Sequence, residues 1–104
     1  METKSPLKKQ IFDLVSTVPK GKIVYFGQIG SKIGVTGQLV GWQLSGMNNQ
    51  EMTAIPWYRV VAKNGFISSL KLGQKGLLQK QILLQEGYTI TGDSVDMEKH
   101  KFEL

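Results

Sequence analysis

Three adjacent side chains with different chemistry, Trp57, Tyr58 and Arg59, stand within the run TAIPWYRVVAKNG, residues 53–65. Pro56 precedes them and cannot donate a hydrogen bond to a neighbouring strand, so the run predicts a rigid entry to a short strand. Two large rings in succession on a strand point to opposite faces. The run therefore predicts aromatic side chains that are presented to a partner or ligand.

The other side chains that can do chemistry are scattered. The sequence has no cysteine, which removes thiolate nucleophiles and cysteine metal ligands, and its one histidine, His100, lies in a charged tail. Ser68 and Ser69 lack the context of a nucleophile elbow. Glu86 falls in the last turn of a predicted helix, where a glutamate is usually a surface residue or a local hydrogen-bond acceptor. We expect no metal, no cofactor and no enzymatic activity.

Charge is distributed unevenly along the 104 residues, which carry a formal net charge of +5. Residues 1–80 hold eleven Lys or Arg and three acids, whereas residues 81–104 hold two lysines and five acids. A basic body attracts polyanions, nucleic acid above all, although a surplus of lysines also keeps a protein soluble. No apolar run is long enough to span a membrane, and no signal peptide is evident. We expect a cytoplasmic, monomeric protein without a membrane partner, made of one domain over residues 1–104 and associated with the nucleoid if it is bacterial.

The first segment predicts a helix with one face in the core. Ser5 can cap this helix, Pro6 suits its first position, and Pro19 ends it. Apolar residues recur at helical spacing between these limits, at Leu7, Ile11, Leu14, Val15 and Val18.

Two short helices are predicted next. In the first, Phe26 and two isoleucines lie at helical spacing, and Gly34 is a natural left-handed cap. Thr36 suits the N-cap of the second, whose inner face holds Val40, Leu44 and Met47. Two helices joined by a tight glycine turn form a helix-turn-helix pattern.

The outer face of the second of these helices carries no charged residue. It holds Gln38, Gly41, Trp42 and Ser45. A solvated face normally bears charges and glycine weakens a helix, so the pattern indicates that another surface approaches this face closely. Two interpretations remain open: the face packs on the tail of the chain, with Trp42 as its cover, or it contacts a ligand.

The remaining elements are predicted with less local signal. Residues 55–69 predict a hairpin or wing, in which the strand IPWYRVVA is followed by the turn signal NG and by a returning strand that begins FIS. Residues 71–76 predict a loop, and residues 88–104 predict a strand and a last turn of helix. A further helix, ending at Gly87, holds Leu77, Leu78, Ile82, Leu83 and Leu84. The expected fold class is mainly α with a small β wing, a winged helix-turn-helix-like DNA-binding domain.

Five segments, in this order, resemble the DNA-binding domain of O6-alkylguanine-DNA alkyltransferases. They are PKGKIVYFGQI (19–29), LVG (39–41), IPWYRVV (55–61), NG (64–65) and LLQEG (83–87), and the resemblance covers about residues 7–95. The central motif of the alkyltransferases is Pro-Cys-His-Arg, whose cysteine accepts the alkyl group. Trp57 stands at the cysteine position, as tryptophan does in the alkyltransferase-like proteins, to which the chain is more similar.

The resemblance implies a helix-turn-helix that enters the minor groove and a pocket that receives a guanine rotated out of the duplex. An indole in place of the thiol can hold a modified base but accepts no alkyl group, and a phenol at the histidine position is a poor general base. Glu86 matches the glutamate of the family. The implied DNA-binding residues are Phe26, Thr36, Gln38, Gly41, Trp42 and Ser45, and the implied lesion pocket is made of Trp57, Tyr58, Arg59 and Ser68.

The function that the resemblance implies is recognition of O6-alkylguanine without repair, marking the lesion for nucleotide excision repair. The implied partners are double-stranded DNA containing O6-alkylguanine and the proteins of nucleotide excision repair.

Two positions depart from the family. Phe26 stands where the family has a tyrosine that turns the phosphate of the extruded nucleotide, and Gln38 replaces an arginine finger. Glutamine can hydrogen-bond an orphaned cytosine but brings no charge, so these departures imply weaker flipping or a changed target.

The residues also allow other interpretations. A basic chain of this size can bind DNA non-specifically as an architectural protein, and the neutral helix face can bind a protein instead of DNA. Trp57 and Tyr58 can be packing aromatics. Arg59 can be a structural cation that pairs with Glu86 or with a backbone carbonyl.

Overall fold

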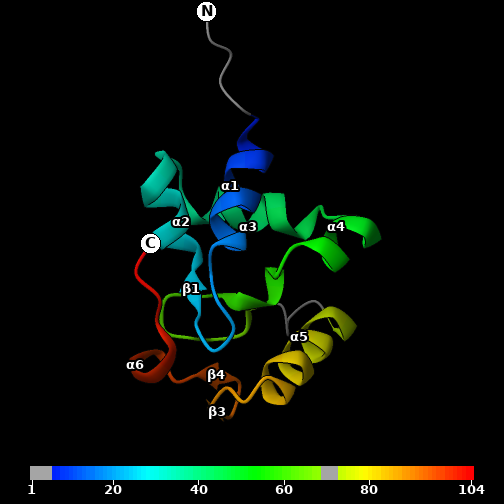
Figure 1. Ribbon diagram of the computed structural model, residues 1–104, viewed down its shortest axis with the longest axis vertical. Helices are drawn as coiled ribbons and strands as arrows, with labels where there is room; N and C mark the ends of the chain where they lie inside the picture. Colours follow the sequence, from blue (N-terminus) through cyan, green and yellow to red (C-terminus); the bar gives the residue numbers. More distant parts are fainter. Residues whose placement is uncertain (1–5, 69–72) are drawn as a thin grey trace, which may run out of the picture.

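Helices form most of the chain, for which a computed structural model describes residues 6–68 and 73–104. The first three helices are α1 (Leu7–Ser16), α2 (Phe26–Ile33) and α3 (Gly37–Ser45), which pack together at one end of the molecule (Figure 1). The mainly helical fold class predicted from the sequence is confirmed. Residues of these helices and of the segments packed against them form the first core cluster, which consists of Ile11, Val15, Val18, Val24, Ile29, Val40, Leu44, Met47, Trp57 and Val60.

α1 has the predicted amphipathic pattern, with Ile11 and Val15 fully buried. Pro6 is the N-cap and not the first helical residue, because its ψ of 146° keeps the backbone extended there. The predicted position of Pro6 is therefore wrong by one residue. The predicted cap Ser5 lies outside the described residues.

The turn between α2 and α3 has the caps that the sequence predicts. Gly34 ends α2 with a left-handed φ of 82°, and the Thr36 hydroxyl accepts a hydrogen bond of 3.1 Å from the Leu39 amide. The two helices approach closely at Gly37, where a Cβ would lie 3.0 Å from the Gly27 nitrogen. The predicted helix-turn-helix is confirmed.

A helix that the sequence analysis did not predict, α4 (Asn49–Ala54), follows the helix-turn-helix. It begins with a capping box, in which the Asn48 side chain accepts from the Glu51 amide at 2.8 Å and the Glu51 carboxylate accepts from the Asn48 amide at 3.0 Å. Lys8 of α1 contacts the same carboxylate at 2.9 Å. The backbone hydrogen bond at Asn48 and the hydrogen bond from Lys8 lower the pKa of Glu51.

The predicted strand over IPWYRVVA is wrong in its first half. Trp57–Arg59 form a short 3-10 helix, η1, closed by a 3.1 Å hydrogen bond from the Arg59 amide to the Pro56 carbonyl. The strand β2 (Val60–Val61) starts only after it and pairs in parallel with β1 (Val24–Tyr25), with Val24 opposite Val60. A proline that cannot donate to a ladder and the turn around it prevent an earlier start of the strand.

The predicted hairpin over residues 55–69 also differs from the structure. The turn at Asn64 and Gly65 is confirmed, since Gly65 has a φ of 89° and the Phe66 amide donates to the Asn64 side chain at 3.1 Å. The returning segment, however, pairs with the C-terminal hairpin of β3 (Ile90–Thr91) and β4 (Ser94–Val95), through an antiparallel bridge from Phe66 to Ser94. Residues 69–72, which include the end of this predicted strand, lie outside the described residues.

The second core cluster lies beneath this small β region and consists of Ile23, Val61, Ile67, Leu83, Tyr88 and Val95. α5 (Gln74–Gln85) contributes Leu83 to it, and the other buried residues of this helix are Gly76 and Gln79. α5 begins inside the segment predicted to be a loop, and Leu77, Leu78 and Leu84 on its other side are exposed. A last helical turn, α6 (Met97–His100), forms as predicted, and the chain beyond it returns to β1, where the Phe102 amide donates to the Ile23 carbonyl.

His100 is part of this packing. Its Nε2 accepts a 3.0 Å hydrogen bond from the Thr89 amide, which leaves Nδ1 to donate to the Gly21 carbonyl at 2.8 Å. Its ring lies 4.8 Å from the ring of Tyr88. The one histidine of the chain therefore joins three segments of the fold. None of the helices within residues 6–68 and 73–104 has the length and apolar character needed to cross a membrane.

Candidate functional site

The outer face of α3 is open in the structure. Trp42 is 76% exposed, and Gln38 and Ser45 are exposed beside it. The C-terminal tail does not cover this face, because it runs along β1 instead. The interpretation of Trp42 as a cover for the tail is therefore wrong, and the face is available to a partner.

Gly41 in the middle of this face is not required by packing within the described residues. A Cβ at this position would meet the Phe26 ring at 3.8 Å, an ordinary contact. At Gly30 and Gly37, in contrast, a Cβ would lie 2.4 Å and 3.0 Å from backbone atoms. Glycine inside a helix costs about 1 kcal/mol relative to alanine. The absence of a side chain at position 41 thus indicates a close approach from outside the chain.

The other predicted contact residues surround this point. Phe26 is the first residue of α2, and its partly buried ring packs on the first core cluster next to Gly41. Thr36 is exposed and holds the start of α3 through its cap. The structure thus brings Phe26, Thr36, Gln38, Gly41, Trp42 and Ser45 together on or beside the second helix of the helix-turn-helix.

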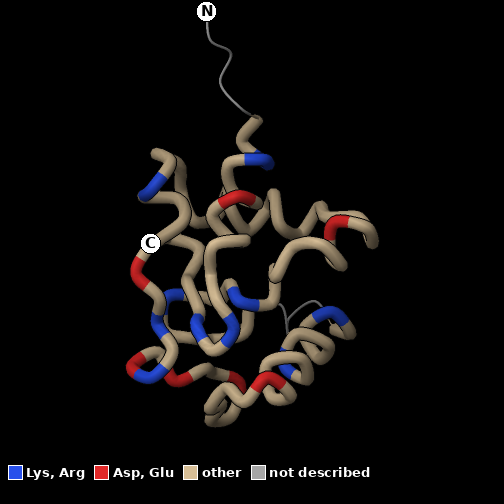
Figure 2. Tube along the Cα trace, in the orientation of Figure 1, with Lys and Arg blue, Asp and Glu red and all other residues tan. Residues whose placement is uncertain are grey.

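This face carries no charge of its own. Figure 2 shows α3 without Lys or Arg, whereas basic residues lie on α1, α2 and α5 and on the segments around β1 and α6. Hydrogen bonding, shape and stacking are therefore the interactions that α3 can offer to a partner.

Trp57 lies in η1 with only 6% of its surface exposed. The ring of Tyr58 meets it edge-on, with centroids 5.8 Å apart. Lys75, in the first turn of α5, places its Nζ 5.5 Å from the Trp57 ring centroid, and burial lowers the pKa of this lysine. Lys75 is not among the site residues expected from the sequence, because residues 71–76 predict a loop and α5 begins inside that segment.

Gln79 of α5 holds the backbone of this turn in place. Its side-chain nitrogen donates to the carbonyls of Tyr58 and Val60, both at 3.0 Å. Gln79 is buried, so these bonds are shielded from water. The conformation that presents Trp57 and Tyr58 therefore depends on a polar residue from a distant segment.

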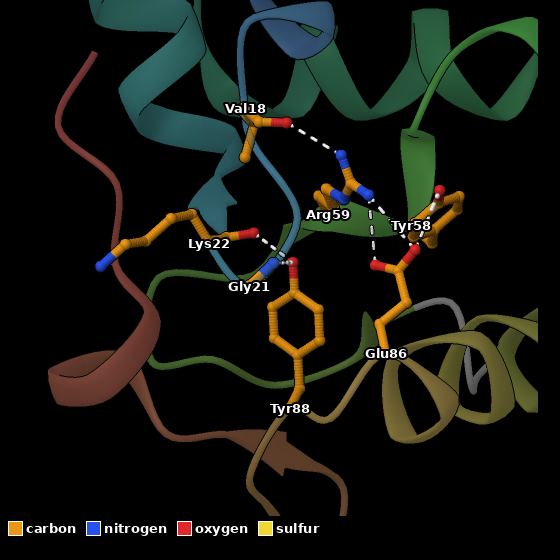
Figure 3. Close-up of polar contacts among 7 residues, drawn as sticks. All are labelled: Val18, Gly21, Lys22, Tyr58, Arg59, Glu86 and Tyr88. Atoms are coloured by element: carbon orange, nitrogen blue, oxygen red, sulfur yellow. Dashed lines mark hydrogen bonds and ion pairs between the residues drawn. The ribbon is translucent and has the colours of Figure 1, made fainter.

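Arg59 has the structural contacts that one interpretation assigned to it. Figure 3 shows its guanidinium between the Val18 carbonyl, at 2.9 Å, and the Glu86 carboxylate, whose two oxygens lie 3.2 Å from Nη2. The Tyr58 hydroxyl reaches the same carboxylate at 3.5 Å. Both predicted partners of Arg59, Glu86 and a backbone carbonyl, are confirmed.

Tyr88 completes this polar cluster from below. Its hydroxyl donates to the Lys22 carbonyl at 2.6 Å and accepts from the Gly21 amide at 3.0 Å (Figure 3). Burial is the main cause that raises the pKa of Tyr88. The polar contacts thus tie together the turn before β1, η1 and the segment at the end of α5. Ser68, the last predicted pocket residue, is half-buried at the end of the described range 6–68, and its role stays a prediction.

The second helix of the helix-turn-helix has an open, uncharged outer face. The aromatic turn η1 (Trp57–Arg59) comes later in the chain and is partly buried. These features define a helix-turn-helix domain of the class that binds nucleic acid. The chain belongs to the family described as 6-O-methylguanine DNA methyltransferase, DNA binding domain, whose model matches residues 6–88.

Similar proteins carry two kinds of name. A DNA base-flipping protein of Vibrio parahaemolyticus is 35% identical over 97 residues, which cover 90% of this chain and 93% of that protein. One of Escherichia coli is 27% identical over 105 residues, which cover 98% and 78%. A methylated-DNA–protein-cysteine methyltransferase of Saccharolobus islandicus is 34% identical, but the match covers 82% of this chain and only 53% of that protein.

Solved structures share the fold. The crystal structure of S. pombe Atl1 in complex with damaged DNA containing O6-carboxymethylguanine has a TM-score of 0.80 at 24% identity, covering 93% of this chain and 94% of that one. A variant of Mycobacterium tuberculosis OGT has a TM-score of 0.64 at 18% identity, covering 88% of this chain and 54% of that one.

Proposed function

We propose that this protein binds duplex DNA through the outer face of α3, turns a nucleotide out of the duplex and holds O6-alkylguanine at Trp57 without accepting its alkyl group. The observation that carries the proposal is the open face of α3, where Gly41 has no packing reason among the described residues and Trp42 is 76% exposed. The names of the base-flipping relatives support the same interpretation.

The two parts of the site have different tasks in this proposal. Gln38, Gly41, Trp42 and Ser45 contact the minor groove, with Gly41 as the point of closest approach, while Phe26 and Thr36 support the helix from the side. Because the face is neutral, the attraction to phosphates comes from the lysines elsewhere on the chain, and its salt dependence is shared by all duplexes.

In this proposal the lesion is held by the aromatic turn η1 (Trp57–Arg59), whose Trp57 belongs to the first core cluster. Trp57 and Tyr58 supply stacking surface, Ser68 supplies a hydroxyl, and Arg59 fixes Tyr58 through their shared contact with Glu86. The chain contains no cysteine, so it has no thiolate to accept an alkyl group. The bound lesion stays chemically unchanged, and the complex marks it for nucleotide excision repair.

The experiment that tests this function compares two duplexes that differ only in one O6-methylguanine. We expect tighter binding to the lesion duplex, because its weakened base pair costs less to open and its methyl group gains apolar contact at Trp57. Equal affinities at several salt concentrations would contradict lesion recognition. A common salt slope without discrimination would favour the second candidate, a non-specific architectural protein, which the net charge of +5 supports.

A further inference from the structure

We propose that the indole of Trp42 inserts between base pairs of the bound duplex and fills the space that an extruded nucleotide leaves. This inference rests on the proposed function, since only a flipped nucleotide leaves such a space. It goes beyond groove contact by α3, because it assigns one side chain to the interior of the base stack.

The first observation is the exposure of this ring. Trp42 is 76% exposed, more than Leu77, Leu78 or Leu84, the other large apolar side chains that are exposed within the described residues. Tryptophan is largely buried on average in folded proteins, so its exposed ring forgoes a large gain from burial. The ring gains that contact only when a partner covers it. Trp57, the second tryptophan of the chain, is 6% exposed, so its ring can line a pocket but does not project from the surface into a base stack.

The second observation is the position of the ring on α3. Trp42 lies four residues after Gln38, so the two side chains share one face of the helix. It directly follows Gly41, where the backbone can come closest to a partner. A partner that approaches the backbone at position 41 therefore meets the exposed Trp42 ring beside it.

The third observation is the match in chemistry. An indole has about the size of a base, and an aromatic ring stacked on a base contributes about 1–3 kcal/mol in known complexes. Minor-groove proteins commonly separate base steps with apolar side chains. Gln38, one turn away, is polar and can hydrogen-bond the base that has lost its partner. The two residues therefore divide the work, with Trp42 replacing the lost stacking and Gln38 the lost pairing.

The test uses three short duplexes that differ only in the residue opposite one cytosine. This residue is guanine, O6-methylguanine or a tetrahydrofuran abasic site. The abasic duplex contains the gap but has no base for the site at Trp57, so its binding reports insertion separately from lesion recognition. We expect the wild-type protein to bind the abasic duplex on the order of tenfold more tightly than the guanine duplex. Trp42→Ala should lose most of this ratio, and Trp42→Phe should keep most of it.

Leu77→Ala is the matched control, because it removes another exposed apolar side chain from a different helix. It should leave the ratio unchanged. Intrinsic fluorescence gives an independent measurement, since stacking quenches an indole: the abasic duplex should quench the wild-type protein and should quench Trp42→Ala much less. The thermal unfolding midpoint of each variant shows whether it is folded.

Two results would overturn the inference. If Trp42→Ala weakens binding to all three duplexes by the same factor, the ring makes a surface contact without insertion. If Trp42→Ala changes the affinity for none of them, Trp42 serves another partner. The inference and the proposed function can fail separately. A Trp42-dependent abasic preference without discrimination of O6-methylguanine supports insertion and contradicts lesion recognition. If Trp42→Ala keeps both the discrimination of O6-methylguanine and the preference for the abasic duplex, lesion recognition is supported and insertion is contradicted.

Discussion

The guanidinium of Arg59 faces the carboxylate of Glu86, with Nη2 3.2 Å from both carboxylate oxygens. Only 13% and 18% of the two side chains are exposed, so water screens the pair weakly. Glu86 is therefore paired with a cation that lies two residues after Trp57 in the chain. A glutamate held in this way supports the shape of the site.

Removing the carboxylate tests this structural role. Glu86→Ala leaves the Arg59 charge mostly buried without its partner, and we expect the free energy of unfolding to fall by about 2 kcal/mol. Lys9→Met is the control, because Lys9 and Asp13 form an exposed pair, and it should cost less than about 0.5 kcal/mol. Denaturant unfolding measures both. Equal losses in the two variants would mean that the Arg59–Glu86 pair adds no more than a surface contact.

Gly41→Ala should separate stability from binding. The new methyl group meets the Phe26 ring at an ordinary 3.8 Å, and alanine favours the helix, so we expect an increase in stability of about 0.5–1 kcal/mol. Binding to every duplex should weaken, because the methyl group prevents close approach to the groove. Gly37→Ala is the contrasting variant and should destabilise the fold, since its Cβ would lie 3.0 Å from the Gly27 nitrogen. Unchanged DNA affinity in Gly41→Ala would exclude the groove contact at this position.

The two departures from the family pattern give a set of substitutions on the α3 side of the site. Phe26→Tyr adds a hydroxyl and Gln38→Arg adds a charge, and each should tighten binding to the lesion duplex by about 1 kcal/mol. Gln38→Ala should loosen it by a similar amount. Titration of labelled duplex measures all three. If none of them changes the affinity, α3 does not enter DNA as proposed.

Installing a thiol at Trp57, the first residue of the aromatic turn, should not create a transferase. In Trp57→Cys, Tyr58 supplies no efficient base and Glu86 is engaged by Arg59, so we expect little or no transfer of label from O6-methylguanine to protein. Adding Tyr58→His should give slow transfer at best, because loss of the buried indole also leaves a cavity. Rapid transfer by Trp57→Cys alone would show that the site is still arranged for catalysis.

Tyr88 should make the fold sensitive to alkaline pH. Its pKa is raised in the folded state, so its contribution to stability is complete below its unfolded pKa of about 10 and is lost as the pH rises through the folded value. Tyr88→Phe removes two hydrogen bonds and should cost about 1–2 kcal/mol at pH 8. This difference between the wild type and Tyr88→Phe should shrink above about pH 10. Denaturant unfolding across this range measures it, and a constant difference would contradict the titration of Tyr88.

Elements with local signals could be predicted from the sequence. Thr36 caps α3 through an amide three residues away, and Gly34 ends α2 by its own backbone conformation. The capping box of Asn48 and Glu51 is an equally local signal for α4 that the sequence analysis overlooked. Short hydrogen bonds within a turn leave a pattern that can be recognised in a single segment.

The aromatic turn could not be predicted in the same way. Trp57 and Tyr58 were expected on a strand, whereas the structure bends them into η1, whose backbone is held by Gln79 from a helix some twenty residues later. The exposure of Trp42 was likewise undecided, because it depends on where the tail runs. In both cases the outcome depends on whether two segments far apart in the sequence contact each other. The sequence pattern of either segment does not show this.

The parallel pairing of β1 with β2 joins the start of α2 directly to the end of η1, and Val24, Val60 and Val61 bury this junction almost completely. Because α2 in turn packs on α3, the separation between α3 and Trp57 is set by packing within the fold. In the proposed complex, a protein built in this way inspects the nucleotide at one constant offset from its groove contact. Each nucleotide that it inspects must therefore be brought to that same offset in its turn.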